Sequence, residues 1–399
     1  MNLTSGYPYS LVRYGLPFNY PALNNDLSTD VVIVGGGISG ALMAHYLMKD
    51  GVNTMVLDER TIGLGSTCAS TSLLQYEIDT PLSELQKKIG KQEAITAYKL
   101  CAEAIDKLTG IAGEIGLEDF EKKESLYYAH RKKDDAFLKK EFEIRKESGF
   151  DVQLLDQTEI MKTFNFNTSS GILSAKAAQT NAYSFTHTLL QYNIKKGLNV
   201  YDRTRAEKII YSKANVVIKT NTGHTIKARK LIFANGYEAI HYIDKKIVNL
   251  DSTYVVCSEQ MNRKTIINTD ALLWSTGHPY LYMRTTLDNR ILIGGKDEPF
   301  YNPEKRDKLI EKKSAELCRE FLKLFPTAVF KPEFNWAGTF GTTKDGLPFI
   351  GQYKKMYNSY FALGYGGNGI TFSLIAAEIL SNELKGYKSN LKIFSFDRV

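Results

Sequence analysis

Residues 30–40 read DVVIVGGGISG, and this stretch decides the fold. Residues 30–34 predict a short buried strand, and residues 38–50 carry apolar side chains at helical spacing. Gly35, Gly37 and Gly40 between them fit the pattern G-x-G-x-x-G. A second predicted strand at 53–57 ends in Asp58, 18 residues beyond Gly40. A strand, a glycine turn, a helix and an acid after the next strand together predict a dinucleotide-binding unit.

Each part of this motif has a physical role. Gly35 permits the tight turn, Gly37 lets the backbone approach a pyrophosphate, and Gly40 packs the helix close to the strand. The start of the helix offers free N–H groups and a positive dipole end to the phosphates. Asp58 can accept hydrogen bonds from ribose hydroxyls, and it would repel a 2′-phosphate, which disfavours NADP.

Composition and charge exclude several other classes of protein. The chain has 399 residues, of which 43% are hydrophobic and 24% charged, as in ordinary globular proteins of two or three domains. Its net charge is +7, but basic residues alternate with acids, as at 121–124 and 304–313, and form no long block. We therefore expect a solvated surface rather than a nucleic-acid partner.

The cysteines and the N-terminal segment also restrict the interpretation. Four scattered cysteines include no C-x-x-C pair and no zinc-like spacing, so no metal site is predicted. Residues 1–29 lack the apolar core of a signal peptide, and no apolar run reaches the ~20 residues of a transmembrane span. We expect a cytoplasmic protein without a transmembrane segment. The three prolines within residues 5–29 predict an extended arm that wraps the body.

Helical and strand patterns are mixed along the rest of the chain. Helices are predicted at 80–116 with a break at Gly90, and at 134–148, 184–196, 306–325 and 369–384. Strands are predicted at 126–129, 216–220, 225–229 and 231–233, with a hairpin turn at 221–224, and residues 252–296 alternate as in an antiparallel sheet. The fold class is therefore α/β with an antiparallel part.

Three further stretches bear on which dinucleotide is bound. Residues 60–75, which follow Asp58, form a loop of small residues that can crowd a pyrophosphate and cover a flavin ring. Residues 230–236, KLIFANG, read as a strand that ends in small residues. The stretch WAGTFGTTKDGLPFIG at 336–351 precedes LGYGGNGIT at 363–371, where glycines lead into the last helix. The N–H groups at that helix start can face an anion.

These stretches, in this order, resemble the D-amino-acid oxidase (DAO) family of FAD-dependent oxidoreductases, over almost the whole chain. The family includes glycine oxidase, sarcosine oxidase and γ-glutamylputrescine oxidoreductase, and the N-terminal arm resembles the last of these most. The resemblance implies a Rossmann-type FAD-binding domain of the glutathione-reductase-like type and a second, antiparallel-sheet substrate domain. It places the discontinuous FAD domain at 1–78, 170–243 and 335–399, with 1–29 as the arm, and the substrate domain at 79–169 and 244–334.

The resemblance also implies which residues contact the cofactor. We expect FAD to bind non-covalently, because Gly338 stands where sarcosine-oxidase-like members carry the attachment cysteine. The expected cofactor-binding residues are Gly35, Gly37, Ile38, Ser39, Gly40, Asp58, Glu59, Arg60, Gly65, Ser66, Thr67, Ser70, Thr71, Ser72, Leu73, Ala206, Ala234, Asn235, Gly236, Gly338, Gly366, Gly367, Asn368, Gly369, Ile370 and Thr371.

The family oxidises a C–N bond. Hydride passes from the carbon to flavin N5, and the imine is then hydrolysed. The resemblance thus implies an FAD-dependent amine or amino-acid-derivative oxidase or dehydrogenase with a small-molecule amine substrate. Two alternatives stay open, an FAD-dependent 2-hydroxy-acid dehydrogenase and a flavin-bound protein without turnover. The electron acceptor, whether oxygen, a quinone or a carrier, is also open.

The substrate anchor departs from the family pattern. Glycine-oxidase-like members place arginines where this chain has Phe340 and Gly367, and sarcosine-oxidase-like members use a lysine where it has Thr371. A carboxylate is best held by a guanidinium, so the substrate is not expected to be a plain α-amino acid held in the usual way.

A replacement cation and the cavity walls come from the presumed substrate domain and the last glycine stretch. Alternation along a strand places Tyr280, Tyr282 and Arg284 on one face, which makes Arg284 the candidate substrate anchor. Trp274, Tyr254 and Tyr365 are candidate walls of the substrate cavity, together with Tyr282.

Overall fold

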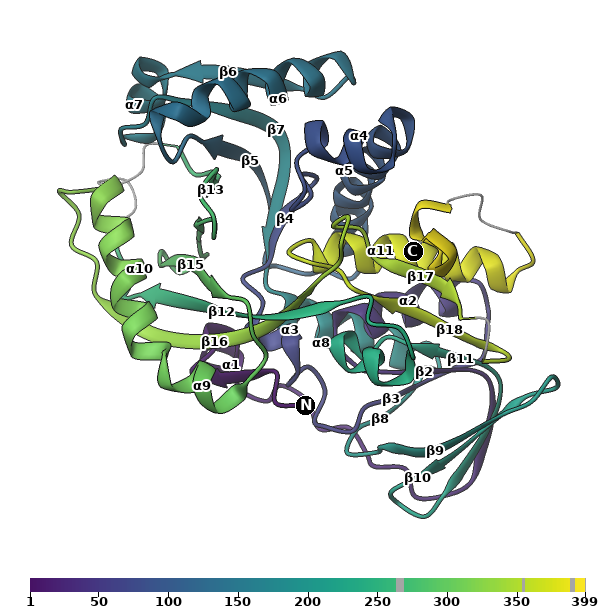
Figure 1. Cartoon of the computed structure of the whole chain (residues 1–399). Coiled ribbons are helices and arrows are strands. Elements are labelled where there is room, and N and C mark those ends of the chain that lie inside the picture. The colour runs from purple at the N-terminus through teal and green to yellow at the C-terminus, as the bar shows by residue number, and fades with distance from the viewer. Residues whose placement is uncertain (263–268, 354–355, 388–391, 399) are drawn as a thin grey trace.

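Two β-sheets organise the residues that the computed structural model describes, which are 1–262, 269–353, 356–387 and 392–398. One sheet is built around parallel strands and the other is mainly antiparallel, and helices pack on both (Figure 1). The expected fold class, α/β with an antiparallel part, is confirmed.

The eight-stranded sheet contains the dinucleotide unit. Its strand order is β17-β18-β11-β2-β3-β8, with β9 and β10 attached through β11. Strand β2 pairs in parallel with both β3 and β11, so the carboxyl ends of all three strands meet at one edge of the sheet. The strands of this sheet are β2 (Leu27–Val34), β3 (Thr54–Leu57), β8 (Asn199–Tyr201), β9 (Ala206–Tyr211), β10 (Val216–Thr220), β11 (Thr225–Phe233), β17 (Phe349–Gln352) and β18 (Ser359–Leu363).

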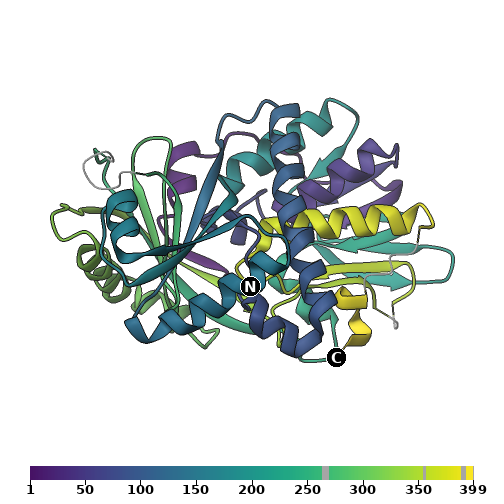
Figure 2. The same ribbon diagram turned by 90° about the horizontal axis from the view of Figure 1, so that it is seen from above.

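Helices cover the eight-stranded sheet and bury a large apolar core. Helix α2 (Ile38–Lys49) packs against α8 (Ala182–Ile194) and α11 (Gly369–Leu384), and α11 packs against α5 (Lys91–Glu114). Seen from above, α11 lies along the sheet beside α2 (Figure 2). Almost every residue of α11 up to Ser381 is buried, which explains its apolar sequence.

The ten-stranded sheet forms the other half of the molecule. Its order is β1-β16-β12-β15-β14-β13-β5-β7-β4, with β6 paired to β7. Helix α10 (Ile310–Leu324) packs on β12, β15 and β16, and α6 (Asp135–Glu147) packs on β6 and β7. The strands are β1 (Thr4–Gly6), β4 (Leu73–Gln75), β5 (Phe120–Tyr128), β6 (Val152–Asp156), β7 (Ser170–Thr180), β12 (Asn249–Ser258), β13 (Leu272–Ser275), β14 (Tyr282–Thr285), β15 (Ile291–Glu298) and β16 (Pro332–Thr342).

Several predicted elements are confirmed. The break at Gly90 separates α4 (Leu82–Ile89) from α5. Strands β10 and β11 form the predicted hairpin. The antiparallel prediction for 252–296 holds for β12, β13, β14 and β15, and β13 also pairs in parallel with β5. Residues 263–268 of that prediction lie outside the described residues.

The prediction that residues 1–29 form an extended arm is wrong in part. Thr4–Gly6 form β1, which pairs with β16, and Tyr9–Tyr14 form the short helix α1. Pro8 precedes this helix with a φ of −56°, a value that suits a helix start. Tyr9 is buried, and its hydroxyl donates to Asp288. Tyr9 therefore packs in the interior, which the proline pattern of this segment did not indicate.

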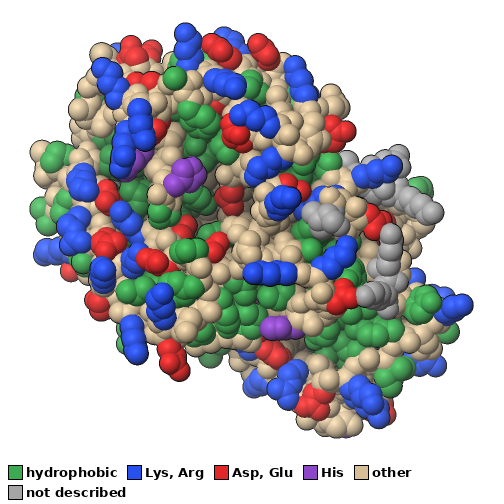
Figure 3. Space-filling view, viewed as in Figure 1, with side chains coloured by type: hydrophobic (Ala, Val, Ile, Leu, Met, Phe, Trp, Pro, Cys, Tyr) green, Lys and Arg blue, Asp and Glu red, His purple; other side chains and the backbone are tan. Residues whose placement is uncertain are grey.

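Three further predictions concern the surface charge, membrane-spanning helices and the cysteines. Basic side chains are spread over one face among acidic ones (Figure 3). In the part of the chain that the structure describes, no helix is both long and apolar enough to span a bilayer. All four cysteines are free thiols.

Candidate active site

The glycine turn after β2 is closely packed on both sides. Gly35 has a φ of +112°, and a Cβ atom there would lie 2.5 Å from the carbonyl oxygen of Ala234 at the end of β11. A Cβ on Gly37 would lie 2.6 Å from Oγ1 of Thr67, and one on Gly40 would lie 1.8 Å from the Gly35 carbonyl oxygen. The turn is therefore a cradle that any side chain would fill.

Asp58, at the end of β3, braces this turn. Its Oδ2 accepts a hydrogen bond of 2.7 Å from the Gly36 N–H, and its Oδ1 accepts one of 2.8 Å from the Arg60 N–H. Burial raises the pKa of Asp58 to about 6, against the lowering effect of these two backbone donors. The carboxyl thus ties the first strand–helix connection to the second strand.

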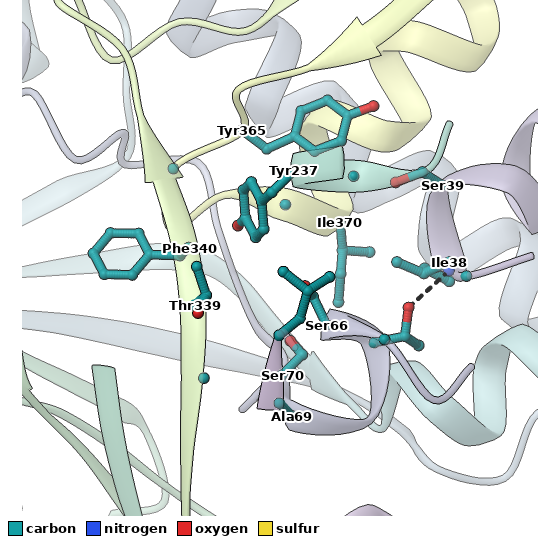
Figure 4. A pocket seen from close by; sticks show the side chains of 18 of the residues that line it. Ile38, Ser39, Ser66, Ala69, Ser70, Tyr237, Thr339, Phe340, Tyr365 and Ile370 are labelled. Carbon is teal, nitrogen blue, oxygen red and sulfur yellow. Dashed lines mark hydrogen bonds between the residues drawn. The ribbon is translucent and has the colours of Figure 1, made fainter. Parts of the chain in front are cut away.

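A continuous cavity runs from the glycine turn along β16 and into the ten-stranded sheet. Side chains from residues 66–70, from Thr339 on β16 and from Ile370 at the start of α11 surround it (Figure 4). Every predicted cofactor residue lines this cavity except Gly40 and Thr371. Gly40 lies beneath the turn, and the Thr371 hydroxyl donates to the Asn368 carbonyl inside the molecule.

The lining residues fit a large polar ligand such as FAD. Helices α2 and α11 both begin at the cavity, and neither N-cap residue, Gly37 nor Asn368, caps its helix with a side chain. Oγ of Ser66 and Oδ1 of Asn235 are buried without a hydrogen-bond partner, and both residues line the cavity. Unpaired buried polar atoms and open helix starts are features that a bound pyrophosphate and its attached groups would satisfy.

The start of α11 is fastened to the chain on the other side of the cavity. The Asn368 side-chain amide donates to the carbonyl oxygens of Gln75 (3.1 Å) and Glu77 (2.8 Å), in and just beyond β4. The N–H of Gly367 donates to Asp79. These bonds fix the glycine loop relative to β4 and the segment that follows it.

Of the five residues predicted for the substrate cavity, three line the described cavity, whereas Tyr254 is buried in β12 outside its lining. Trp274, Tyr282 and Tyr365 line the cavity. Trp274 stacks on Tyr127 with ring centroids 3.7 Å apart. Burial raises the pKa values of Tyr282 and Tyr365, so both phenols are neutral at physiological pH.

The structure does not bring Arg284 into the cavity. Its guanidinium donates to three backbone carbonyls, those of Thr71, Thr180 and Thr285. The residue is 4% exposed, and it is absent from the cavity lining. Tyr282 and Arg284 lie two positions apart on β14, as the alternation requires, but the loop at Thr71 and the end of β7 cover the arginine.

Four carboxylates of the cavity lining were not predicted from the sequence, and they are Glu77, Asp79, Glu238 and Asp297. Asp79 comes shortly after β4, and Asp297 lies in β15. Neither acid belongs to a motif, and each has basic or acidic neighbours typical of a surface segment. Only the packing of distant segments shows that they face an interior space.

The glycine turn lies at the carboxyl ends of parallel strands, and the antiparallel sheet closes the cavity on the other side. These features define a dinucleotide-binding protein. The family model described as FAD dependent oxidoreductase (DAO) matches residues 30–383. The chain belongs to this family, so it is an FAD flavoprotein and an oxidoreductase, as the resemblance implied.

The relatives agree on the family but differ from this chain in most residues. A probable oxidoreductase OrdL from Haemophilus influenzae is 22% identical, over 94% of this chain and 88% of that protein. The γ-glutamylputrescine oxidoreductase of Escherichia coli is also 22% identical, over 98% of this chain and 91% of that protein. The crystal structure of glycine oxidase from Geobacillus kaustophilus aligns with a TM-score of 0.79 and 19% identity, covering 93% of this chain and 99% of that one.

Proposed function

We propose that this protein oxidises a C–N bond of an amine or amino-acid derivative. The observation that carries the proposal is the continuation of the FAD-fitting cavity into a pocket with aromatic walls formed by Trp274, Tyr280 and Tyr282. When FAD is bound, it supplies the acceptor for a hydride from the carbon that bears the nitrogen, and the imine product is hydrolysed to a carbonyl compound. The relatives named for glycine and γ-glutamylputrescine support an amine substrate.

The side chains of the pocket bind and shield the substrate rather than carry the chemistry. The aromatic walls exclude water, and the neutral phenols can donate hydrogen bonds. A neutral amine needs no strong general base before hydride leaves the carbon. Among the described lining residues there is no histidine.

Two features of the cavity, its acidic lining and the pocket beyond the cofactor residues, disfavour the two alternative functions that the sequence left open. A 2-hydroxy acid carries a carboxylate, which Asp79 and Asp297 would repel. Oxidation of a C–O bond would also need a base beside the carbon, and His278, the histidine nearest in sequence to Tyr280, does not line the described cavity. A flavin-bound protein without turnover would need no shaped pocket beyond its cofactor.

We propose that FAD is held without a covalent bond. Gly338 on β16 lines the cavity and has no side chain to offer. The thiol of Cys68, in the neighbouring loop, donates to the Gly65 carbonyl, and burial raises its pKa to about 12. A thiol that remains protonated and does not line the cavity is a poor attachment group. Denaturation should therefore release all of the flavin.

Anaerobic reduction of the bound flavin tests the proposed function. The purified holoprotein is mixed without oxygen with glycine, sarcosine, D- and L-amino acids, polyamines, γ-glutamyl amines and hydroxy acids in turn. We expect at least one amine to bleach the visible flavin band and the hydroxy acids to leave it unchanged. Bleaching by hydroxy acids alone would establish the dehydrogenase alternative, and bleaching by none of them the protein without turnover.

A further inference from the structure

Asp79 lies in the cavity lining beside Gly367, the position where the resemblance to glycine-oxidase-like members led us to expect an arginine. Its Oδ2 accepts a 2.7 Å hydrogen bond from the N–H of Gly367, and its Oδ1 accepts one of 3.1 Å from the Tyr280 hydroxyl. A Cβ atom on Gly367 would lie 2.6 Å from Oδ1 of Asp79 and 2.9 Å from the Tyr280 hydroxyl oxygen, so a side chain there would displace both groups. This chain thus has an acid at the place where the resemblance led us to expect a cation.

Asp297 is a second carboxylate of the same pocket. Its Oδ1 is buried and has no hydrogen-bond partner, and Thr253 on β12 hydrogen-bonds the group. Burial raises the pKa of Asp297 to about 7, and the charge of Asp79 acts in the same direction. Burial raises the pKa of Asp79 as well. The ammonium group of Lys313, which pairs with Glu298, acts on Asp297 in the opposite direction, but the effect of burial outweighs it.

The cationic side chains of the cavity lie elsewhere. Among the described lining residues, Arg60 and Arg205 are the cations, and both lie near the ends of β3 and β9 rather than in the aromatic pocket. Arg60 donates to Glu238, and Arg205 to Glu207. Neither guanidinium compensates Asp79 or Asp297.

A third acid of the cavity lining, Glu77, gives independent support for a polar ligand. Glu77 lines the cavity and is 4% exposed. Its Oε1 accepts from Ser174 and from Arg145, so its charge is compensated. Its Oε2, however, is buried without a partner. Unpaired buried oxygens in one cavity are costly, and a ligand with several N–H donors would satisfy them.

We propose that the substrate is an aliphatic di- or polyamine whose ammonium groups bind to Asp79 and Asp297. Before hydride leaves, the nitrogen on the carbon to be oxidised gives its proton to the carboxylate that holds it and becomes the neutral amine. The inference rests on the proposed function only for the oxidation step, since the binding claim stands on the pocket itself. Two nearby carboxylates favour a ligand with more than one cationic nitrogen, because each new charge pair relieves the repulsion between them. Trp274, Tyr280 and Tyr282 suit such a ligand, since aromatic faces attract ammonium groups.

The test measures binding without turnover. The holoenzyme is first reduced with dithionite, and 1,4-diaminobutane, butylamine and 4-aminobutanoate are each titrated into it by calorimetry. These probes share a four-carbon chain and differ in the group at the far end. We expect the diamine to bind at least about tenfold more tightly than butylamine, and 4-aminobutanoate to bind most weakly. Equal affinities, or tighter binding of 4-aminobutanoate, would overturn the inference.

Variants then assign the binding to the two residues. Asp79→Asn and Asp297→Asn should each weaken diamine binding at least about tenfold while the flavin content stays complete. The matched control is Asp106→Asn, which removes one charge on α5 from an exposed pair with Lys176, outside the cavity lining, and should change the affinity less than about twofold. Unchanged diamine affinity in both cavity variants would overturn the assignment. If a variant lost its flavin, the comparison of the three probes on the wild-type enzyme would still decide the substrate class.

The outcomes separate this inference from the proposed function. Diamine binding that depends on both carboxylates, with no amine able to reduce the flavin, would uphold the binding claim of this inference and refute the proposed function. Oxidation of an amine that carries a carboxylate, with no effect of either Asp→Asn variant, would uphold the function and refute the inference.

Discussion

The cofactor site depends on the absence of a side chain at Gly37. A Cβ atom there would lie 2.6 Å from Oγ1 of Thr67, and this oxygen accepts the Ile38 N–H at 3.1 Å. A side chain at position 37 would displace Thr67 and enter the space that a pyrophosphate needs. The same turn has Gly35 against the end of β11, so it cannot move back to make room.

Gly37→Val should therefore abolish FAD binding. The purified variant should emerge colourless from gel filtration, whereas the wild type retains a flavin absorbance. Gly110→Ala is the matched control, because a Cβ atom at this position of α5 meets nothing within 4 Å, and it should keep the full flavin content. A yellow, stoichiometrically loaded Gly37→Val protein would count against the assignment of the turn.

Asp297 should make the stability of the ligand-free holoprotein depend on pH. Its folded pKa of about 7 lies above the unfolded value of about 3.9, so the folded state retains a proton that the unfolded chain has released. The contribution of this group to stability thus falls as the pH rises from about 4 to about 7. Asp297→Asn should stabilise the protein by about 1 kcal/mol or more at pH 8 and have little effect at pH 4. Thermal unfolding at both pH values measures this, and an equal shift at both would contradict it.

At the scale of elements, a buried ion cluster joins α6 to α4 and to the chain beyond β4. Arg145 donates to Glu141 at 2.9 Å and lies 3.5 Å from Glu77. Glu141 in turn accepts the N–H groups of Leu82 and Ser83 at the start of α4. All three charged groups are buried, so each depends on the others.

Arg145→Met should destabilise the protein by about 3–5 kcal/mol, because it leaves buried carboxylates without their cation. Chemical denaturation of the FAD-loaded protein measures the change. Lys87→Met removes a cation from an exposed pair with Glu84 and should cost less than about 1 kcal/mol. If the two substitutions lowered the free energy of unfolding by similar amounts, the buried cluster would not stabilise the packing of α6 against α4.

Elements whose bounds depend on adjacent residues could be predicted from the sequence. Elements whose bounds depend on pairing with distant segments could not. The glycine motif, the break at Gly90 and the hairpin at 221–224 each depend on a few adjacent residues. Strand β5 begins at Phe120 rather than at 126, because its first residues pair with the far end of β7. The predicted helix at 306–325 is instead two helices, α9 (Pro303–Lys308) and α10.

The candidate site divides in the same way. The cofactor residues stand in motifs, and nearly all of them line one cavity. Arg284 was predicted from strand alternation, which gives the face of a side chain but not what covers it. Asp79 and Asp297 have no motif, and they meet only because β15 and the segment after β4 approach the same space.

At the scale of the whole molecule, the cavity draws its lining from both sheets. Val34 at the end of β2 and the residues that directly follow β2, β3 and β11 face it from one sheet, and residues of β12 to β16 face it from the other. The division of the chain into domains at residues 78, 169, 243 and 334 remains a prediction, but a ligand in this cavity would contact both of the predicted parts.

FAD binding should consequently stabilise the entire chain. At a free concentration of 100 times the Kd, bound FAD should add about 2.7 kcal/mol to the free energy of unfolding. Thermal unfolding of the apoprotein should shift to higher temperature as FAD is added, in one transition for both sheets. Two separate transitions, of which only one responded to FAD, would contradict a ligand held between them.

The most direct test of the central claim, oxidation of a C–N bond, is product analysis after a single anaerobic turnover. The holoenzyme is mixed with the amine that bleaches its flavin best, and the carbonyl product and the released ammonia or smaller amine are quantified. We expect one equivalent of each per flavin reduced. Reduction of the flavin without release of a nitrogen compound would contradict the account.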